Sequence, residues 1–253
     1  MIAHLGMYDR PETAAANDRF WNEIKAQLGY GPDALTRGLA DYWPVWQSPD
    51  LLFSQTCGFP YRARLHGHVQ LIGTPDYGLD GCPPGYYRSV FVARADDAGT
   101  PLEAFAGRTM AYNEALSQSG WAAPMNHLSP QGIRPGSLLK SGGHAASARA
   151  VAEGRADFAA LDALTWELLK TYDAFAAGLA EIAWTDPTPA LPYITAKDRD
   201  AEAIAQATGT AILNLDPKDR EILHLKGLVR IPASTYLDVA TPPAPEEFAA
   251  AAA

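Results

Sequence analysis

The chain has 253 residues, 47% of them hydrophobic, which is enough for one large domain or for two lobes with their own cores. Its net charge is -9, so it lacks the basic surface that nucleic acids or anionic lipids require of a partner. Two cysteines, Cys57 and Cys82, are too few for a disulfide framework or a cysteine metal cluster. An acidic chain can still bind a small anion, because backbone N–H groups and helix N-termini attract negative charge locally.

The N-terminal residues carry neither the basic start nor the apolar run of a signal peptide. No stretch approaches the roughly 20 apolar residues that a membrane-spanning helix needs. We therefore expect no membrane insertion. The sequence as written predicts a cytoplasmic protein, or a periplasmic one if a leader has been removed.

Apolar residues follow strand and helix periods in alternation along the chain. We expect strands at residues 2–8, 51–53, 69–73, 86–93, 108–113, 138–140, 158–162, 179–184 and 191–195. Helices are expected at residues 11–27, 34–45, 101–105, 143–153 and 163–172, in a further segment after Ser119, and through most of the end of the chain. This alternation predicts α/β architecture with parallel sheets, in which ligands bind beyond the carboxyl ends of the strands.

The same pattern predicts two α/β lobes. The chain leaves a first lobe near residue 92, builds a second one, and returns near residue 190. The first lobe would contain residues 1–92 and 190–253, and the second residues 93–189. Two crossings of this kind predict a hinge and a central cleft.

The most informative motif is Ser117-Gln118-Ser119-Gly120, which follows a predicted strand and precedes a predicted helix. Serines at such a junction offer hydroxyl and backbone N–H donors to an anion, and glycine permits close approach of the backbone. The alternative is that Ser117 or Ser119 is only a helix N-cap. Spacing alone leaves both interpretations open.

A second junction of the same kind is Ser141-Gly142-Gly143-His144. It can bring a serine hydroxyl, backbone amides and an imidazole to one ligand. Its alternative is a plain helix start with a surface histidine. Two such junctions in one lobe favour a shared anion site, since both lie at the same edge of the predicted sheet.

Other residues have competing interpretations. Asp162 ends a strand just before a helix, so it is a candidate N-cap as well as a ligand-facing carboxylate. Cys57 is either a buried apolar residue or a nucleophile with His144 as its base. His66 and His68 lack a third metal ligand in the sequence, so we expect no metal site.

These motifs resemble the phosphate/phosphonate-type substrate-binding proteins of ABC transporters. The similarity lies in Tyr112-Asn113 followed by the Ser117–Gly120 motif, in Ser141-Gly-x-His144-x-x-Ser147, and in Ala160-x-Asp162-Ala163-x-Thr165-Trp166, with Thr188-Pro189-x-Leu191-Pro192 further on. The resemblance implies a periplasmic-binding-protein-like fold of type II, with two α/β lobes, a hinge and a small phosphate- or phosphonate-like organic anion in the cleft between the lobes.

The resemblance also implies roles for residues. Ser117 and Ser119 would bind the phosphonate-like oxygens, His144 would assist, and Asp162 would face the other side of the ligand. The full set of candidate ligand-binding residues is Ser117, Gln118, Ser119, Gly120, Ser141, His144, Asp162, Tyr8, Gln55, Thr56, Tyr112 and Trp121. No catalytic residue, metal or cofactor is expected, and the partner would be an ABC permease or another protein.

Two alternatives remain at this point. One is a cytoplasmic enzyme similar to the thiamine-pathway pyrimidine synthases, using Cys57 and His144. The other is a ligand sensor that acts through a protein partner.

Overall fold

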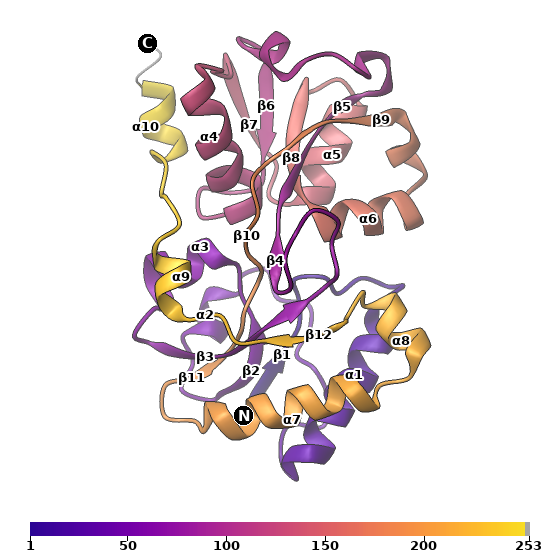
Figure 1. Ribbon diagram of the computed structural model, residues 1–253, viewed down its shortest axis with the longest axis vertical. Coiled ribbons are helices and arrows are strands. Elements are labelled where there is room, and N and C mark those ends of the chain that lie inside the picture. Colours follow the sequence, from indigo (N-terminus) through magenta and orange to yellow (C-terminus); the bar gives the residue numbers. More distant parts are fainter. Residues whose placement is uncertain (251–253) are drawn as a thin grey trace. The chain divides into compact units, whose positions relative to one another are not determined.

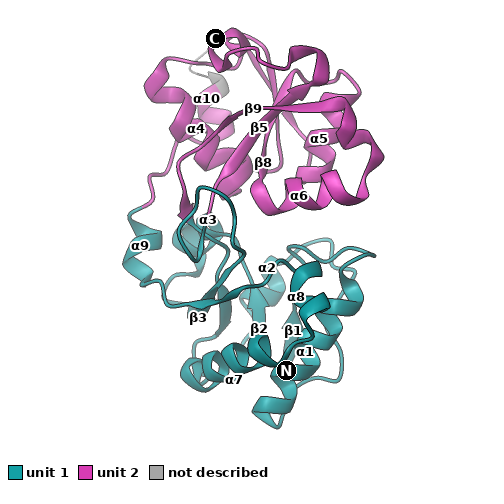
Figure 2. Ribbon diagram, turned by 45° about the vertical axis from the view of Figure 1, so that its right-hand side comes forward, with its two compact units in different colours: residues 1–86, 189–238 teal, residues 87–188, 239–253 magenta. Residues whose placement is uncertain are grey.

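The computed structural model describes residues 1–250, and side chains as far as Phe248. It divides into two compact units, which are coloured separately in Figure 2. Unit 1 comprises Met1–Tyr86 and Pro189–Asp238, and unit 2 comprises Tyr87–Thr188 and Val239–Ala253. The chain thus passes from one unit to the other three times, and not only at the two places that the sequence indicated.

The third passage changes the assignment of the C-terminal segment. We expected all of residues 190–253 in the first lobe, but the segment after Asp238 belongs to unit 2. Specific contacts explain the difference. The Phe248 ring packs against Trp121 with centroids 5.9 Å apart, and the Asn126 side chain donates a hydrogen bond to the carbonyl of Ala240.

Unit 1 is built on a five-stranded sheet in the order β1-β2-β11-β3-β12. β1 and β2 are parallel, whereas β11 is antiparallel to both β2 and β3, and β12 is antiparallel to β3. The expected all-parallel sheet was wrong, because β11 enters after the passage through unit 2 and inserts between two earlier strands in the opposite direction. The elements of unit 1, most of them labelled in Figure 1, are β1 (Ile2–His4), α1 (Ala14–Leu28), α2 (Trp43–Trp46), β2 (Leu51–Gln55), α3 (Gly58–Pro60), the π-helical turn η1 (Tyr61–Leu65), β3 (Val69–Asp76), β11 (Tyr193–Ala196), α7 (Ala201–Asn214), α8 (Pro217–Ile222), β12 (Gly227–Val229) and α9 (Ala233–Leu237).

The helix expected over residues 34–45 is mostly absent. Only α2 (Trp43–Trp46) is helical there. Gly38 adopts a positive φ of 70°, a backbone conformation that a right-handed helix cannot contain. The apolar residues of this stretch still enter the core, since Leu35, Val45 and Trp46 are buried.

The first two passages between the units run through two short paired strands, β4 (Tyr86–Tyr87) and β10 (Thr188–Pro189). The single strand expected over residues 86–93 is therefore two elements, β4 and β5. The elements of unit 2 are β5 (Ser89–Arg94), η2 (Ala95–Asp97), η3 (Leu102–Phe105), β6 (Thr109–Tyr112), the π-helical turn η4 (Gln118–Ala122), α4 (Ala123–Leu128), η5 (Ser129–Gln131), β7 (Ser137–Lys140), α5 (His144–Ala152), β8 (Phe158–Asp162), α6 (Ala163–Tyr172), η6 (Ala174–Gly178), β9 (Leu179–Trp184) and α10 (Pro245–Ala250).

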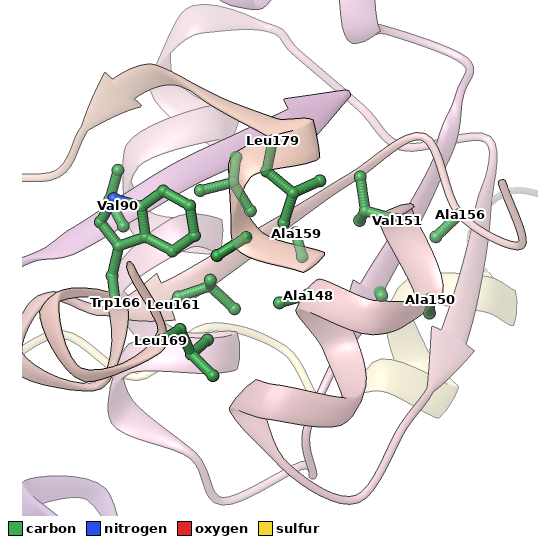
Figure 3. Close-up of a cluster of buried hydrophobic side chains, with 13 residues drawn as sticks. Val90, Ala148, Ala150, Val151, Ala156, Ala159, Leu161, Trp166, Leu169 and Leu179 are labelled. Atoms are coloured by element: carbon green, nitrogen blue, oxygen red, sulfur yellow. The ribbon is translucent and has the colours of Figure 1, made fainter. Parts of the chain in front are cut away.

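Unit 2 also contains a mixed five-stranded sheet, in the order β7-β6-β8-β5-β9. β6 is parallel to β7 and β8, while β5 is antiparallel to β8 and β9. Alternate side chains of a strand point to opposite faces, so Val90 and Phe91 enter different clusters. Val90 joins the cluster with Leu161 and Trp166 that Figure 3 displays, whereas Phe91 contacts the Phe158 ring.

Both faces of this sheet are therefore buried, which leaves the strand ends as the places where polar side chains can gather. Among the residues described, no helix combines the length and the apolar character that crossing a bilayer demands.

Candidate functional site

Three turns of unit 2 follow the carboxyl ends of β6, β7 and β8. Because β6 is parallel to both of its neighbours, these three ends lie at one edge of the sheet. The turn after β7 is tied to the one after β6, since the Ser141 and Gly142 amides donate to the carbonyls of Tyr112 and Asn113, at 2.8 and 3.0 Å. The edge of the sheet thus carries a connected set of polar turns.

The Ser117–Gly120 motif forms the first of these turns. Ser117 is the N-cap of η4, and its Oγ accepts a hydrogen bond from the Gly120 amide at 3.0 Å. The N-cap interpretation of Ser117 is therefore confirmed. It does not compete with ligand binding, because a hydroxyl that accepts a hydrogen bond still has its own hydrogen to donate. Gln118 and Ser119 follow it and are both buried.

Gly120 is required by close packing rather than by its backbone angles. A Cβ added at this position would overlap the side-chain oxygen of Asn113. A second hydrogen bond fixes the turn from β5, where the Ser89 hydroxyl donates to the carbonyl of Ser119 at 2.9 Å. The turn thus contacts Asn113, which follows β6, and Ser89 of β5, two strands that are separated by β8 in the sheet.

His144 lies at the start of α5 and is joined to this turn. Its Nε2 lies 2.8 Å from the Ser119 hydroxyl oxygen. Part of the side chain is exposed, but the Nδ1 atom is buried. Desolvation lowers the pKa of His144 to about 4, against a smaller opposite effect of the Ala160 backbone, so the ring is neutral at physiological pH.

Ser141 and Asp162 have structural hydrogen bonds in the same region. The Ser141 hydroxyl lies 2.7 Å from the Ser147 hydroxyl and 3.1 Å from the carbonyl of Tyr112. One oxygen of Asp162 accepts from the Thr165 amide at 2.9 Å, which makes this residue the N-cap of α6. Asp162 is also 2% exposed, so its carboxylate is buried at the strand end.

Tyr112 and Trp121 pack against each other next to this turn. The Trp121 side chain is fully buried and lies between the rings of Tyr112 and Phe248, at centroid distances of 5.2 and 5.9 Å. Its Nε1 donates to the carbonyl of Pro243. We expected Trp121 to line the ligand site, but these contacts give it a packing role beneath the Ser117–Gly120 turn.

In unit 1, Gln55 is the last residue of β2 and Thr56 follows it, while Tyr8 comes after β1, the strand parallel to β2. The Gln55 amide donates to the Tyr77 hydroxyl at 2.7 Å and to the Leu191 carbonyl at 3.0 Å. The ring of Tyr8 contacts that of Tyr77 edge to face, with centroids 5.4 Å apart. The Thr56 hydroxyl is buried and has no hydrogen-bond partner among the residues described.

Sequence reasoning missed two residues that belong to these groups, Ser89 and Tyr77. It named Asn113 within the motif, but not as the packing partner of Gly120. Tyr77 directly follows β3, which extends three residues beyond the strand expected at residues 69–73. Ser89 contacts the turn through a pairing of β5 that is distant in sequence. No local signal marks either residue.

Cys57 and His144, the pair of the enzyme alternative, belong to different units. Cys57 is buried in unit 1, and His144 is paired with Ser119 in unit 2. The described part of the chain contains no group of three or more His, Cys, Asp or Glu side chains placed to hold a metal ion.

Solved structures with a similar fold come from solute-binding and sensor proteins. PhnD1 of Prochlorococcus marinus, in complex with methylphosphonate, superposes with a TM-score of 0.71 at 18% identity, over 99% of this chain and 97% of that one. A binding-protein component of a phosphonate ABC transporter from Pseudomonas aeruginosa gives 0.67 at 16% identity, over 93% and 83%. A histidine kinase sensor domain with similarity to periplasmic binding proteins gives 0.58 at 15% identity, over 91% and 98%.

The fold is accordingly that of the periplasmic binding proteins, with two α/β units. The chain belongs to the family described as the periplasmic substrate-binding proteins of phosphonate ABC transporters, whose sequence model matches residues 50–236. No curated protein matches the chain significantly. None of the matches named here supports the alternative of a pyrimidine-synthase-like enzyme.

We predict that Gly120→Ala lowers the free energy of unfolding by about 1–3 kcal/mol, because the new methyl group overpacks against Asn113. Urea unfolding followed by circular dichroism measures the change. Gly178→Ala is the control, since a Cβ there meets nothing within 4 Å. Equal stability of the two variants would contradict the close packing of Gly120.

We also predict that His144 makes the free energy of unfolding depend on pH. Its folded-state pKa of about 4 lies below the ordinary value of 6.5, so between these values only the unfolded chain takes up the proton. The free energy of unfolding should therefore decrease as the pH falls through this window.

The variant His144→Asn should lack the part of this decrease in unfolding free energy that comes from His144. Urea unfolding at pH 7 and pH 5 measures the difference. The exposed His68, replaced in the same way, is the control. If His144→Asn showed the same pH dependence as the unaltered protein, the ring would not be held neutral by the fold.

Proposed function

We propose that the chain binds a small phosphate- or phosphonate-like anion at the turns of unit 2, with Ser117 and Ser119 as its main contacts and His144 assisting through Ser119, and does not convert it chemically. The observation that carries this proposal is the 2.8 Å contact between Ser119 and His144, which joins the turn after β6 to the start of α5. Membership of the phosphonate-binding family supports the same ligand class.

The donors at these turns suit a tetrahedral oxyanion. Ser117 accepts a hydrogen bond from Gly120, so its hydroxyl hydrogen remains available to a ligand oxygen. Helical residues run without a break from Gln118 to Leu128, so the positive end of their dipole lies at the motif. None of these groups is a lysine or arginine, so the proposed binding depends on oriented uncharged donors.

Asp162 would set the choice among anions. A buried carboxylate next to the bound oxyanion repels a full dianion, unless the ligand presents a proton or an amine to it. A ligand with an ammonium group or a protonated oxygen would then be preferred. We assign Gln118, Gly120 and Ser141 to the shaping of the turns, and Tyr8, Gln55 and Thr56 to ligand contacts made by unit 1.

The partner in this proposal is an ABC permease to which the bound anion is delivered, which places the chain on the membrane face from which uptake occurs. The similarity to a histidine kinase sensor domain indicates that the fold alone does not separate transport from sensing. A protein partner that reads the ligand-bound form remains the second candidate.

A thermal-shift screen tests the ligand class with phosphate, phosphite, methylphosphonate, aminoethylphosphonate and sulfate. A ligand present at 100 times its dissociation constant stabilises the folded chain by about 2.7 kcal/mol, which is easily measured. Methylphosphonate should also be recovered unchanged after incubation. The absence of a shift with every anion would overturn the proposed function.

Two substitutions then separate binding from selectivity. We predict that Ser119→Ala weakens the affinity for every phosphonate about tenfold or more, through loss of a hydrogen bond to a charged group. Asp162→Asn should change the ranking among ligands instead, and Asn retains the ability to cap α6. Isothermal titration calorimetry measures both effects.

Ser137→Ala is the matched control for the serine variant, because its hydroxyl bonds to Thr109 at the opposite end of β7. Equal losses for all ligands in Ser119→Ala and Asp162→Asn would contradict the division of roles between these residues.

A further inference from the structure

After α9 the chain returns to unit 2 as a C-terminal segment, residues 239–248, held by three side chains of that unit. Asn126 donates to the Ala240 carbonyl at 2.8 Å, Trp121 to the Pro243 carbonyl at 3.1 Å, and Arg134 to the Phe248 carbonyl at 2.6 Å. These bonds are spread along the segment, so it is bound over its whole length.

Phe248 is the apolar anchor of the segment. Its ring meets Trp121 edge to face at an interplanar angle of 85°, and the guanidinium carbon of Arg134 lies 4.2 Å from its centroid. Such a cation–π contact adds to the area buried by the ring. Burial raises the pKa of Tyr112, and the negative charge of Glu246 in the segment raises it further.

The residues that receive these contacts lead directly to the candidate anion site. Trp121 follows Gly120 within η4. The backbone carbonyl of Tyr112 accepts hydrogen bonds from both the amide and the hydroxyl of Ser141. The C-terminal segment therefore contacts Trp121 in the first turn, and the charge of its Glu246 acts on Tyr112, to which the second turn is bonded.

The π-helical geometry of η4 makes outside support necessary. The Ser117 carbonyl accepts from both Trp121 and Ala122, at 3.2 and 3.0 Å, and this widened turn is less favourable than an α-helical one. A large side chain that is fixed from outside holds such a turn in place. We infer that the C-terminal segment positions the Ser117–Gly120 turn for anion binding, with Phe248, Arg134 and Trp121 as positioning residues. This inference rests on the proposed function.

Unit 2 offers a matched control. Phe175 is stacked under Arg149 with the same distance of 4.2 Å, and it packs against the cluster that contains Trp166 and Leu169. Phe175→Ala and Arg149→Ala therefore remove the same kind of contact from another part of the unit. Arg134 and Arg149 are both exposed, so their substitution by alanine removes no side chain from a hydrophobic core.

The test compares Phe248→Ala and Arg134→Ala with these controls in the full chain. Hydrogen exchange of the amides at residues 118–122, measured without ligand, should be about tenfold faster in both test variants and unchanged in both controls. The affinity for methylphosphonate should fall about tenfold in Phe248→Ala, which corresponds to about 1.4 kcal/mol.

The two readouts distinguish the inference from the proposed function. Unchanged exchange at residues 118–122 in Arg134→Ala and Phe248→Ala would overturn the positioning role, whatever the protein binds. Faster exchange with unaltered methylphosphonate affinity would overturn it too. A chain that binds none of the anions fails the proposed function, and the exchange result then decides whether the segment holds the turn.

Discussion

The carbonyl of Ser117 accepts two hydrogen bonds, and the arrangement of unit 2 around the candidate site depends on this one group. By accepting from both Trp121 and Ala122 it widens the start of the helix into a π-helical turn. The wider turn brings Gly120 against the Asn113 side chain, where a β-carbon cannot fit. The end of β6, Gly120 and Ser117 are therefore joined by direct contacts.

An acidic protein that binds an anion must do so through local groups. At the candidate site these are hydroxyls, a helix start and an imidazole kept neutral by desolvation, in a chain of net charge -9. Uncharged donors discriminate by direction and by protonation state, whereas a lysine or arginine would attract any anion. In the proposed function, the buried carboxylate of Asp162 would add repulsion to this selection.

The parts of the fold that the sequence predicted well are those with local causes. The boundary between β8 and α6 falls at Asp162 as expected, because an aspartate that caps a helix also ends the strand before it. The expected helix over residues 34–45 failed at Gly38, whose positive φ depends on its surroundings. The insertion of β11 and the contact of Ser89 with Ser119 are set by pairings distant in sequence, which no local pattern encodes.

The family match ends at residue 236, before the segment that holds Trp121 begins. The motifs of the anion site lie inside the match, so the polar groups and their supporting contacts come from different parts of the chain. A turn with the right donors binds weakly if its geometry fluctuates, because ordering it on binding consumes part of the interaction energy. Affinity in this chain should therefore be set partly by residues far from the motif, and substitutions in the C-terminal segment can alter it while every ligand-contacting group stays the same.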